Sequence, residues 1–104
     1  MSQHYEYAPN GWSSITKPLQ NFIEKNGATV LQIKEKFGGL RVYVNYNGVD
    51  EKTQNTISGA IRFAEFATST MCVRCGNEGK AMTKNGWMTV LCDEHERGTV
   101  EDEY

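Results

Sequence analysis

Two pairs of potential metal ligands in the last third of the chain constrain its fold most strongly. Cys72 and Cys75 are two residues apart, sixteen residues follow, and Cys92 and His95 again stand two residues apart. This spacing is typical of zinc sites built from two ligand pairs. The sequence therefore predicts one Zn²⁺ ion bound by Cys72, Cys75, Cys92 and His95.

The cysteine count favours a metal over disulfides. The chain has three cysteines, so a disulfide framework would leave one thiol over, whereas the same three with a histidine complete a four-ligand site. Buried thiols without metal are the other alternative, but Cys-x-x-Cys beside glycine is a poor core pattern. Four protein ligands saturate tetrahedral zinc, so we expect a structural and not a catalytic ion.

The residues around the ligands predict how the segment folds. Gly76 directly follows Cys75, where a tight turn needs an unusual backbone conformation. Asn85-Gly86 is a strong hairpin-turn dipeptide. Cys92 and His95 are spaced as on the first turn of a short helix. Together these signals predict a treble-clef-like or ribbon-like zinc finger at residues 72–96.

Two amphipathic helices are predicted before the finger. In the first, regular helix begins near Thr16, Pro18 lies in the first turn, and Asn26-Gly27 is the stop. In the second, Asp50 or Thr53 is the cap and the end lies near Met71. The apolar positions that share a helical face are Ile15, Leu19, Phe22 and Ile23 in the first helix, and Ile57, Ile61, Ala64 and Thr68 in the second.

Between the helices, residues 28–37 and 40–46 read as two strands joined at Gly38-Gly39. With these two glycines as the turn, one face is largely apolar and pairs Phe37 with Leu40, Glu35 with Val42, Ile33 with Val44 and Leu31 with Tyr46. The other face pairs Lys36 with Arg41, Lys34 with Tyr43 and Gln32 with Asn45.

The second face is a candidate binding site. Its members Lys34, Lys36, Arg41 and Tyr43 are basic or aromatic, and a like-charge pair across strands is unfavourable unless an acidic neighbour or a bound anion offsets it. The alternative is a solvated strand face whose charges prevent edge-to-edge aggregation.

Length and charge bound the remaining possibilities. A chain of 104 residues is the size of one domain, here divided into an arm (1–12) that ends at Trp12, an α+β core of helix, hairpin and helix (13–71), the finger (72–96) and an acidic tail (97–104). A net charge of -2 argues against a general nucleic-acid coat protein or a membrane-surface protein. The sequence has no apolar run long enough for a membrane span and no signal peptide, so we expect a cytoplasmic protein.

Two motifs carry a resemblance. The segment from Lys34 to Arg41 reads KEKFGGLR, and the finger combines CVRCG, Gly86-Trp87 and LCDEH. In this pairing the chain resembles short uncharacterised proteins of tailed phages and bacteria, from about Gly11 to His95. The resemblance implies a phage-type zinc-binding protein acting in the host cytoplasm, and it brings no activity with it.

As an enzyme the chain is poorly equipped. His4 has no second free histidine beside it, no cysteine is left as a nucleophile, and a nuclease of the HNH type would need a histidine that His95, as a metal ligand, cannot supply. We therefore expect a non-enzymatic accessory protein that binds and inhibits or modulates a host protein, such as a defence factor or a nucleic-acid enzyme. Exposed aromatics such as Trp12, Tyr43 or Trp87 would be its anchors, although each of them taken alone is more typical of a core residue. The alternative is nucleotide or nucleic-acid binding by the basic hairpin face.

Overall fold

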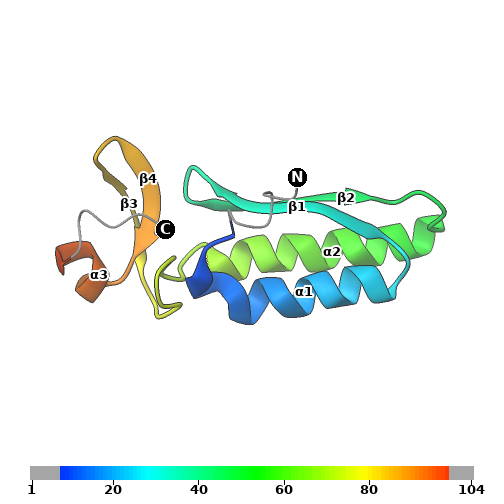
Figure 1. Ribbon diagram of the computed structural model, residues 1–104, viewed down its shortest axis with the longest axis horizontal. Coiled ribbons are helices and arrows are strands. Elements are labelled where there is room, and N and C mark those ends of the chain that lie inside the picture. The colour runs from blue at the N-terminus through cyan, green and yellow to red at the C-terminus, as the bar shows by residue number, and fades with distance from the viewer. Residues whose placement is uncertain (1–7, 99–104) are drawn as a thin grey trace.

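The structure, a computed structural model that describes residues 8–98, has an α+β fold (Figure 1). The predicted order of helix, hairpin, helix and a second small hairpin is confirmed. Among residues 8–98, no helix combines the length and apolar character needed to cross a membrane. The elements are η2 (Asn10–Trp12), α1 (Ser13–Lys25), β1 (Thr29–Lys36), β2 (Gly39–Asn45), α2 (Glu51–Thr68), β3 (Lys80–Lys84), β4 (Trp87–Leu91) and α3 (Asp93–Gly98).

The molecule has a two-layer part and a smaller finger beyond one end of it (Figure 1). The antiparallel pair β1–β2 covers one side of α1 and α2, which run in opposite directions beside each other. The core lies between these layers and includes Ile23, Val30, Leu40 and Ile57. The second sheet, β3–β4, belongs to the finger, close to the turn of the first hairpin.

The turn of the first hairpin lies one residue earlier than predicted. Phe37 and Gly38, with φ of 55° and 81°, are its two central residues, and Lys36 pairs with Gly39. Two successive positive φ values are the mark of the tight turns that suit twisted hairpins. The Gly38 N–H also donates to Glu35 Oε2 at 2.8 Å, which holds the turn in this position. Burial raises the pKa of the Glu35 carboxyl, and the bond from Gly38 opposes that shift.

The pairing of the strands differs accordingly. Glu35 pairs with Leu40 and Lys34 with Arg41, so the predicted pairing of Lys36 with Arg41 is wrong. From Gln32 to Lys36, each residue of β1 pairs with a residue of β2 two positions away from the predicted partner. Because side chains alternate with a period of two, the inward and outward faces are largely kept. A bulge between Val30 and Gln32 breaks this alternation. Val30 is therefore buried in the core, and Leu31, expected there, is 49% exposed.

Valine substitutions at Gly38 and at Gly39 should differ in how much they destabilise the protein. Gly38→Val should destabilise the protein by about 1 kcal/mol or more, because a β-branched residue resists positive φ. Gly39→Val should cost less, since Gly39 is not at positive φ and an added Cβ meets only the Lys36 carbonyl, at 3.6 Å. Urea unfolding of both variants checks the order. A larger loss of stability for Gly39→Val would instead support Gly38 and Gly39 as the central residues of the turn.

The helix starts carry one correction and one confirmation. Regular helix in α1 begins at Ser13, so Pro18 lies in the second turn and not the first. The missing N–H leaves the carbonyl of the exposed Ser14 without its helical donor, at the surface where water can replace it. In α2 the Asp50 side chain accepts the Thr53 N–H at 3.3 Å, as the cap prediction requires.

Candidate metal centre

The structure brings the four predicted ligands together from three elements of the finger. Cys72 and Cys75 lie in the turn after α2, Cys92 directly follows β4, and His95 is in α3. Their ligand atoms all lie within 4.8 Å of one another. Cys72 and Cys92 are buried, His95 is half-buried and Cys75 is exposed. The cluster is compatible with one structural metal ion.

The separations fit a tetrahedral ion. Cys75 Sγ lies 3.7 Å from Cys92 Sγ, and His95 Nδ1 lies 3.6 Å from Cys72 Sγ and 3.3 Å from Cys92 Sγ. Bonds of about 2.3 Å to sulfur and about 2.0 Å to nitrogen put tetrahedral ligands about 3.8 Å apart for two sulfurs and about 3.5 Å apart for sulfur and nitrogen. Nδ1 is the imidazole atom that faces both thiols.

Backbone hydrogen bonds shape the first ligand pair. The Gly76 N–H donates to the Cys72 carbonyl at 2.8 Å, with φ of +84° at Gly76. The Cys72 N–H in turn donates to the Asn77 carbonyl, also at 2.8 Å. A residue with a Cβ at position 76 would resist this φ, and its Cβ would lie 2.6 Å from the Gly11 carbonyl oxygen. The predicted turn at Gly76 is confirmed, with a second reason for glycine.

The second ligand pair is placed by the finger hairpin. Asn85 and Gly86 form its turn, with φ of 54° and 83°, as predicted. The Glu96 N–H donates to the Cys92 carbonyl at 2.8 Å, which puts Cys92 and His95 on one helical turn. Lys84 Nζ donates to the Glu96 carbonyl and ties β3 to α3.

The thiols are electrostatically suited to a cation. Burial alone would raise the pKa of Cys72, but N–H groups of Cys92, Arg74 and Cys75 donate to its sulfur and lower that pKa to about 6. For Cys75, the Asn77 N–H lowers the pKa, and desolvation together with the thiols of Cys92 and Cys72 outweighs it and raises the pKa. At Cys75 the neighbouring thiols therefore oppose ionisation, and a bound cation would remove that opposition.

The other predicted site residues lie on the first hairpin. The outward face of β1–β2 carries Lys34, Lys36, Arg41 and Tyr43. Lys34 Nζ lies 5.7 Å from the centre of the Tyr43 ring, and Lys36 Nζ lies 5.7 Å from that of Phe37. The residues therefore share a surface, with Lys34 opposite Arg41.

Sequence reasoning named Trp87 as an exposed anchor but missed Phe37 and Met88, which are also exposed where the first hairpin turn approaches β4; these three residues are here called the junction cluster. A Cβ added to Gly38 would lie 3.6 Å from the Thr89 nitrogen, so the first hairpin turn approaches β4 closely. Trp87 is 70% exposed, Phe37 61% and Met88 48%. The available signal was an aromatic residue next to a turn glycine in each hairpin, Phe37 before Gly38 and Trp87 after Gly86.

Trp12 is not a surface anchor. Its side chain is fully buried, and its Nε1 donates to the Met71 carbonyl at 2.8 Å. Tyr43 and Trp87 are exposed, as that prediction requires. His4 lies outside the described residues.

Comparisons with known proteins found no matching family model, no matching curated protein and no matching solved structure. The resemblance to short phage and bacterial proteins stays a prediction. The geometry of the finger and of the exposed surfaces is therefore what bears on function.

Proposed function

We propose that this chain is a non-enzymatic, zinc-stabilised module that acts by binding another protein. The observation that supports it best is the junction cluster, where Trp87, Phe37 and Met88 stand exposed at the contact between finger and hairpin. Tryptophan, phenylalanine and methionine are enriched in protein interfaces.

Zinc is the metal that this donor set favours. Three thiols and one imidazole are soft to borderline ligands, and tetrahedral sites of this kind hold zinc. Cys72 and Cys75, then a hairpin, then Cys92 and His95 leading into a helix, follow the order of a treble-clef finger. With four protein ligands the ion would hold the finger together and have no open position for a substrate.

Zinc would act on binding through the position of Trp87. Trp87 begins β4, and the same strand leads into Cys92. A fixed β4 presents the Trp87 side chain without the entropic cost of ordering a loop on binding. If the chain is phage-encoded, as the resemblance implies, the partner is a host protein such as a defence factor or a nucleic-acid enzyme.

The test is a pull-down from host lysate with nuclease-treated and untreated samples. A protein partner should be captured equally in both, and Trp87→Ala should lose most of it, since a central aromatic contributes about 2 kcal/mol or more to an interface. Phe66→Ala is the matched control, because Phe66 is 75% exposed on a different surface.

Zinc content and thermal unfolding of both variants must match the parent protein. Capture that disappears with nuclease, or that survives Trp87→Ala, would contradict this proposal.

The second candidate is binding of nucleic acid by the basic hairpin face. The observation that favours it is charge: Lys34, Lys36 and Arg41 share the outward face, whereas Glu35, the one acidic residue of the two strands, pairs inward with the buried Leu40. Tyr43 adds an exposed ring on which a base could stack.

Salt and charge reversal separate the two candidates. A nucleic-acid ligand should bind less tightly as salt rises, because phosphate contacts release counterions, and Lys36→Glu with Arg41→Glu should abolish binding. We expect no measurable affinity for random duplex DNA, given the net charge of -2. Sub-micromolar binding at physiological salt, in a fluorescence anisotropy titration, would favour the second candidate instead.

A further inference from the structure

The outward face of the first hairpin concentrates positive charge on a chain that is negative overall. Residues 29–45 hold three basic residues and one acidic residue, whereas the whole chain holds 11 basic and 13 acidic ones. The basic residues are Lys34, Lys36 and Arg41, and all three belong to the outward face. The acidic residue, Glu35, is directed to the turn, where its carboxylate accepts a backbone N–H at 2.8 Å. The outward face is therefore cationic.

The three cations have no acidic partners. Within the part of the chain that the structure describes, no carboxylate forms an ion pair with any of them, and the two lysine ammonium groups lie over aromatic rings instead. Lys34 lies directly opposite Arg41, and like charges in that position destabilise a sheet. An anion bound from outside the chain would offset this repulsion.

The cationic face leads into the junction cluster. Lys36 Nζ lies 5.7 Å from the centre of the Phe37 ring, and Phe37 belongs to the turn that approaches β4. Phe37 is 61% exposed although its φ is +55°, a conformation that costs a residue other than glycine stability. A partner that contacts this ring therefore also meets the cations beside it.

We propose, resting on the function proposed above, that the protein partner presents an acidic segment with a bulky apolar residue next to it. The carboxylates of that segment bind Lys34, Lys36 and Arg41, and its apolar side chain packs on Phe37 in the junction cluster. Alternate residues on one face of a strand are about 7 Å apart. Carboxylates at alternate positions of an extended segment therefore match the spacing of Lys34 and Lys36.

The surroundings of the face favour an acidic protein segment over a nucleic acid. Nucleic-acid affinity comes from many phosphate contacts along the strand, and this face offers three cations. A strand that continued past the junction cluster would approach α3 at the far end of the finger, whose first turn holds Asp93, Glu94 and Glu96 (Figure 1). A short acidic segment uses the three cations and ends before α3.

Selection from a random peptide library on the full zinc-loaded chain tests the chemistry of the partner. We expect the enriched peptides to combine aspartate or glutamate with tryptophan, phenylalanine or leucine. Replacing their acidic residues by the matching amides should weaken binding at least about tenfold. Oligothymidylate is the nucleic-acid probe and should bind more weakly than these peptides. Enriched peptides without acidic residues, no enriched peptide, or tighter binding of oligothymidylate would overturn the proposal.

Charge variants locate the site by calorimetric titration with an enriched peptide. Lys34→Gln with Arg41→Gln should weaken binding about fivefold or more. Because this change removes a like-charge pair, it should not lower the unfolding temperature. Lys17→Gln with Lys52→Gln, at exposed positions of α1 and α2, changes the net charge equally and should bind like the parent protein.

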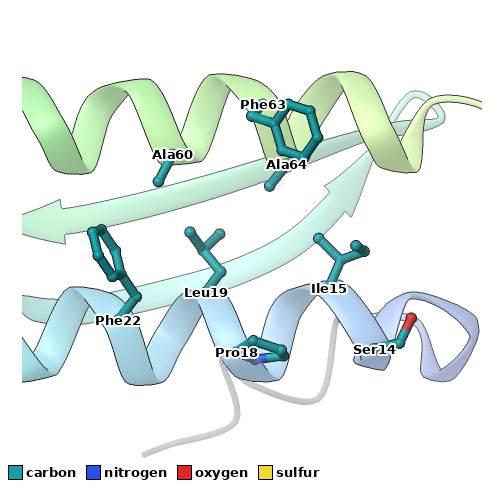
Figure 2. Close-up of a pocket in the computed structure, with 8 residues that line it drawn as sticks. All are labelled: Ser14, Ile15, Pro18, Leu19, Phe22, Ala60, Phe63 and Ala64. Carbon is teal, nitrogen blue, oxygen red and sulfur yellow. The ribbon is translucent and has the colours of Figure 1, made fainter.

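The aromatic contact is tested by Phe37→Asn, because asparagine accepts positive φ and the turn should keep its conformation. We expect about tenfold weaker peptide binding. Phe63→Ala is the matched control, since Phe63 is 67% exposed and borders an apolar groove between α1 and α2, on the side away from the first hairpin (Figure 2). Peptide binding that is unchanged by Phe37→Asn and by the paired substitutions at Lys34 and Arg41 would place the site elsewhere and overturn the proposal.

The acidic partner and the proposed function fail on different results. Enriched peptides that need Trp87 but lack acidic residues would refute the acidic partner and leave the proposed function standing. Capture from lysate that survives Trp87→Ala would refute the proposed function itself.

Discussion

Cys75→Ser is expected to release the metal and unfold at least the segment from Met71 to Glu96. This segment has few large apolar residues, and metal binding supplies folding free energy of about 10 kcal/mol in small zinc modules. The loss should reach beyond the finger, because Cys72, Val73 and Leu91 belong to the same buried cluster as Trp12. Amide hydrogen exchange should show lost protection first in β3, β4 and α3.

Elemental analysis of protein purified without added metal provides the direct measurement, with about one zinc per chain expected. Chelation of the parent protein should reproduce the effect of Cys75→Ser, and added zinc should reverse it only in the parent. Thr83→Ser, at an exposed position of β3, is the control and should retain its metal. Folded protein with almost no zinc and three titratable thiols would refute the metal site.

Gly11→Ala is expected to destabilise the protein by about 3 kcal/mol, near the upper end of overpacking effects. An added Cβ would lie 2.2 Å from the Cys72 carbonyl oxygen and 2.6 Å from the Val73 carbonyl carbon, so backbone must move. The Gly11 N–H also donates to the Val73 carbonyl at 2.8 Å, a bond that the movement would lengthen. Since Cys72 is one of the four candidate metal ligands, zinc affinity should fall as well.

Urea unfolding and a competitive zinc titration measure the two effects of Gly11→Ala. Gly59→Ala is the matched control, because the added methyl group meets no atom within 4 Å and should leave single-chain stability equal or slightly higher. Equal stability of the two variants would mean that η2 does not pack on the finger turn as described.

The features that the sequence determined are local. The turn at Asn85-Gly86 and the cap at Asp50 depend on residues within a few positions, and the structure has both. The ligand spacing likewise led directly to Cys72, Cys75, Cys92 and His95, which the fold gathers within 4.8 Å. Where short-range geometry alone sets the conformation, the residue types suffice to predict it.

The position of the first hairpin turn needed the tertiary structure. Both Phe37-Gly38 and Gly38-Gly39 can supply two residues at positive φ, and residue types alone favoured the glycines. The Glu35 carboxylate bonds the Gly38 N–H, and the backbone at Gly38 lies against Thr89 of the finger, so Phe37 takes the strained position. The bulge that turns Leu31 outward likewise lets Val30 fill the core.

Contacts between distant segments decided the rest. Gly11 is glycine because the backbone of Cys72 and Val73 passes within contact distance, and Trp12 is buried because Met71 offers a carbonyl to its indole. The same holds for Phe63 and Phe66, whose exposure depends on α2 having the hairpin on one side and no element of the described chain over the groove. The sequence by itself determined the two candidate ligand pairs, the cap of α2 and the turns at Gly76 and Asn85-Gly86, because each of these is set by neighbouring residues. The packing of segments far apart in the chain decided which surfaces remain exposed for binding.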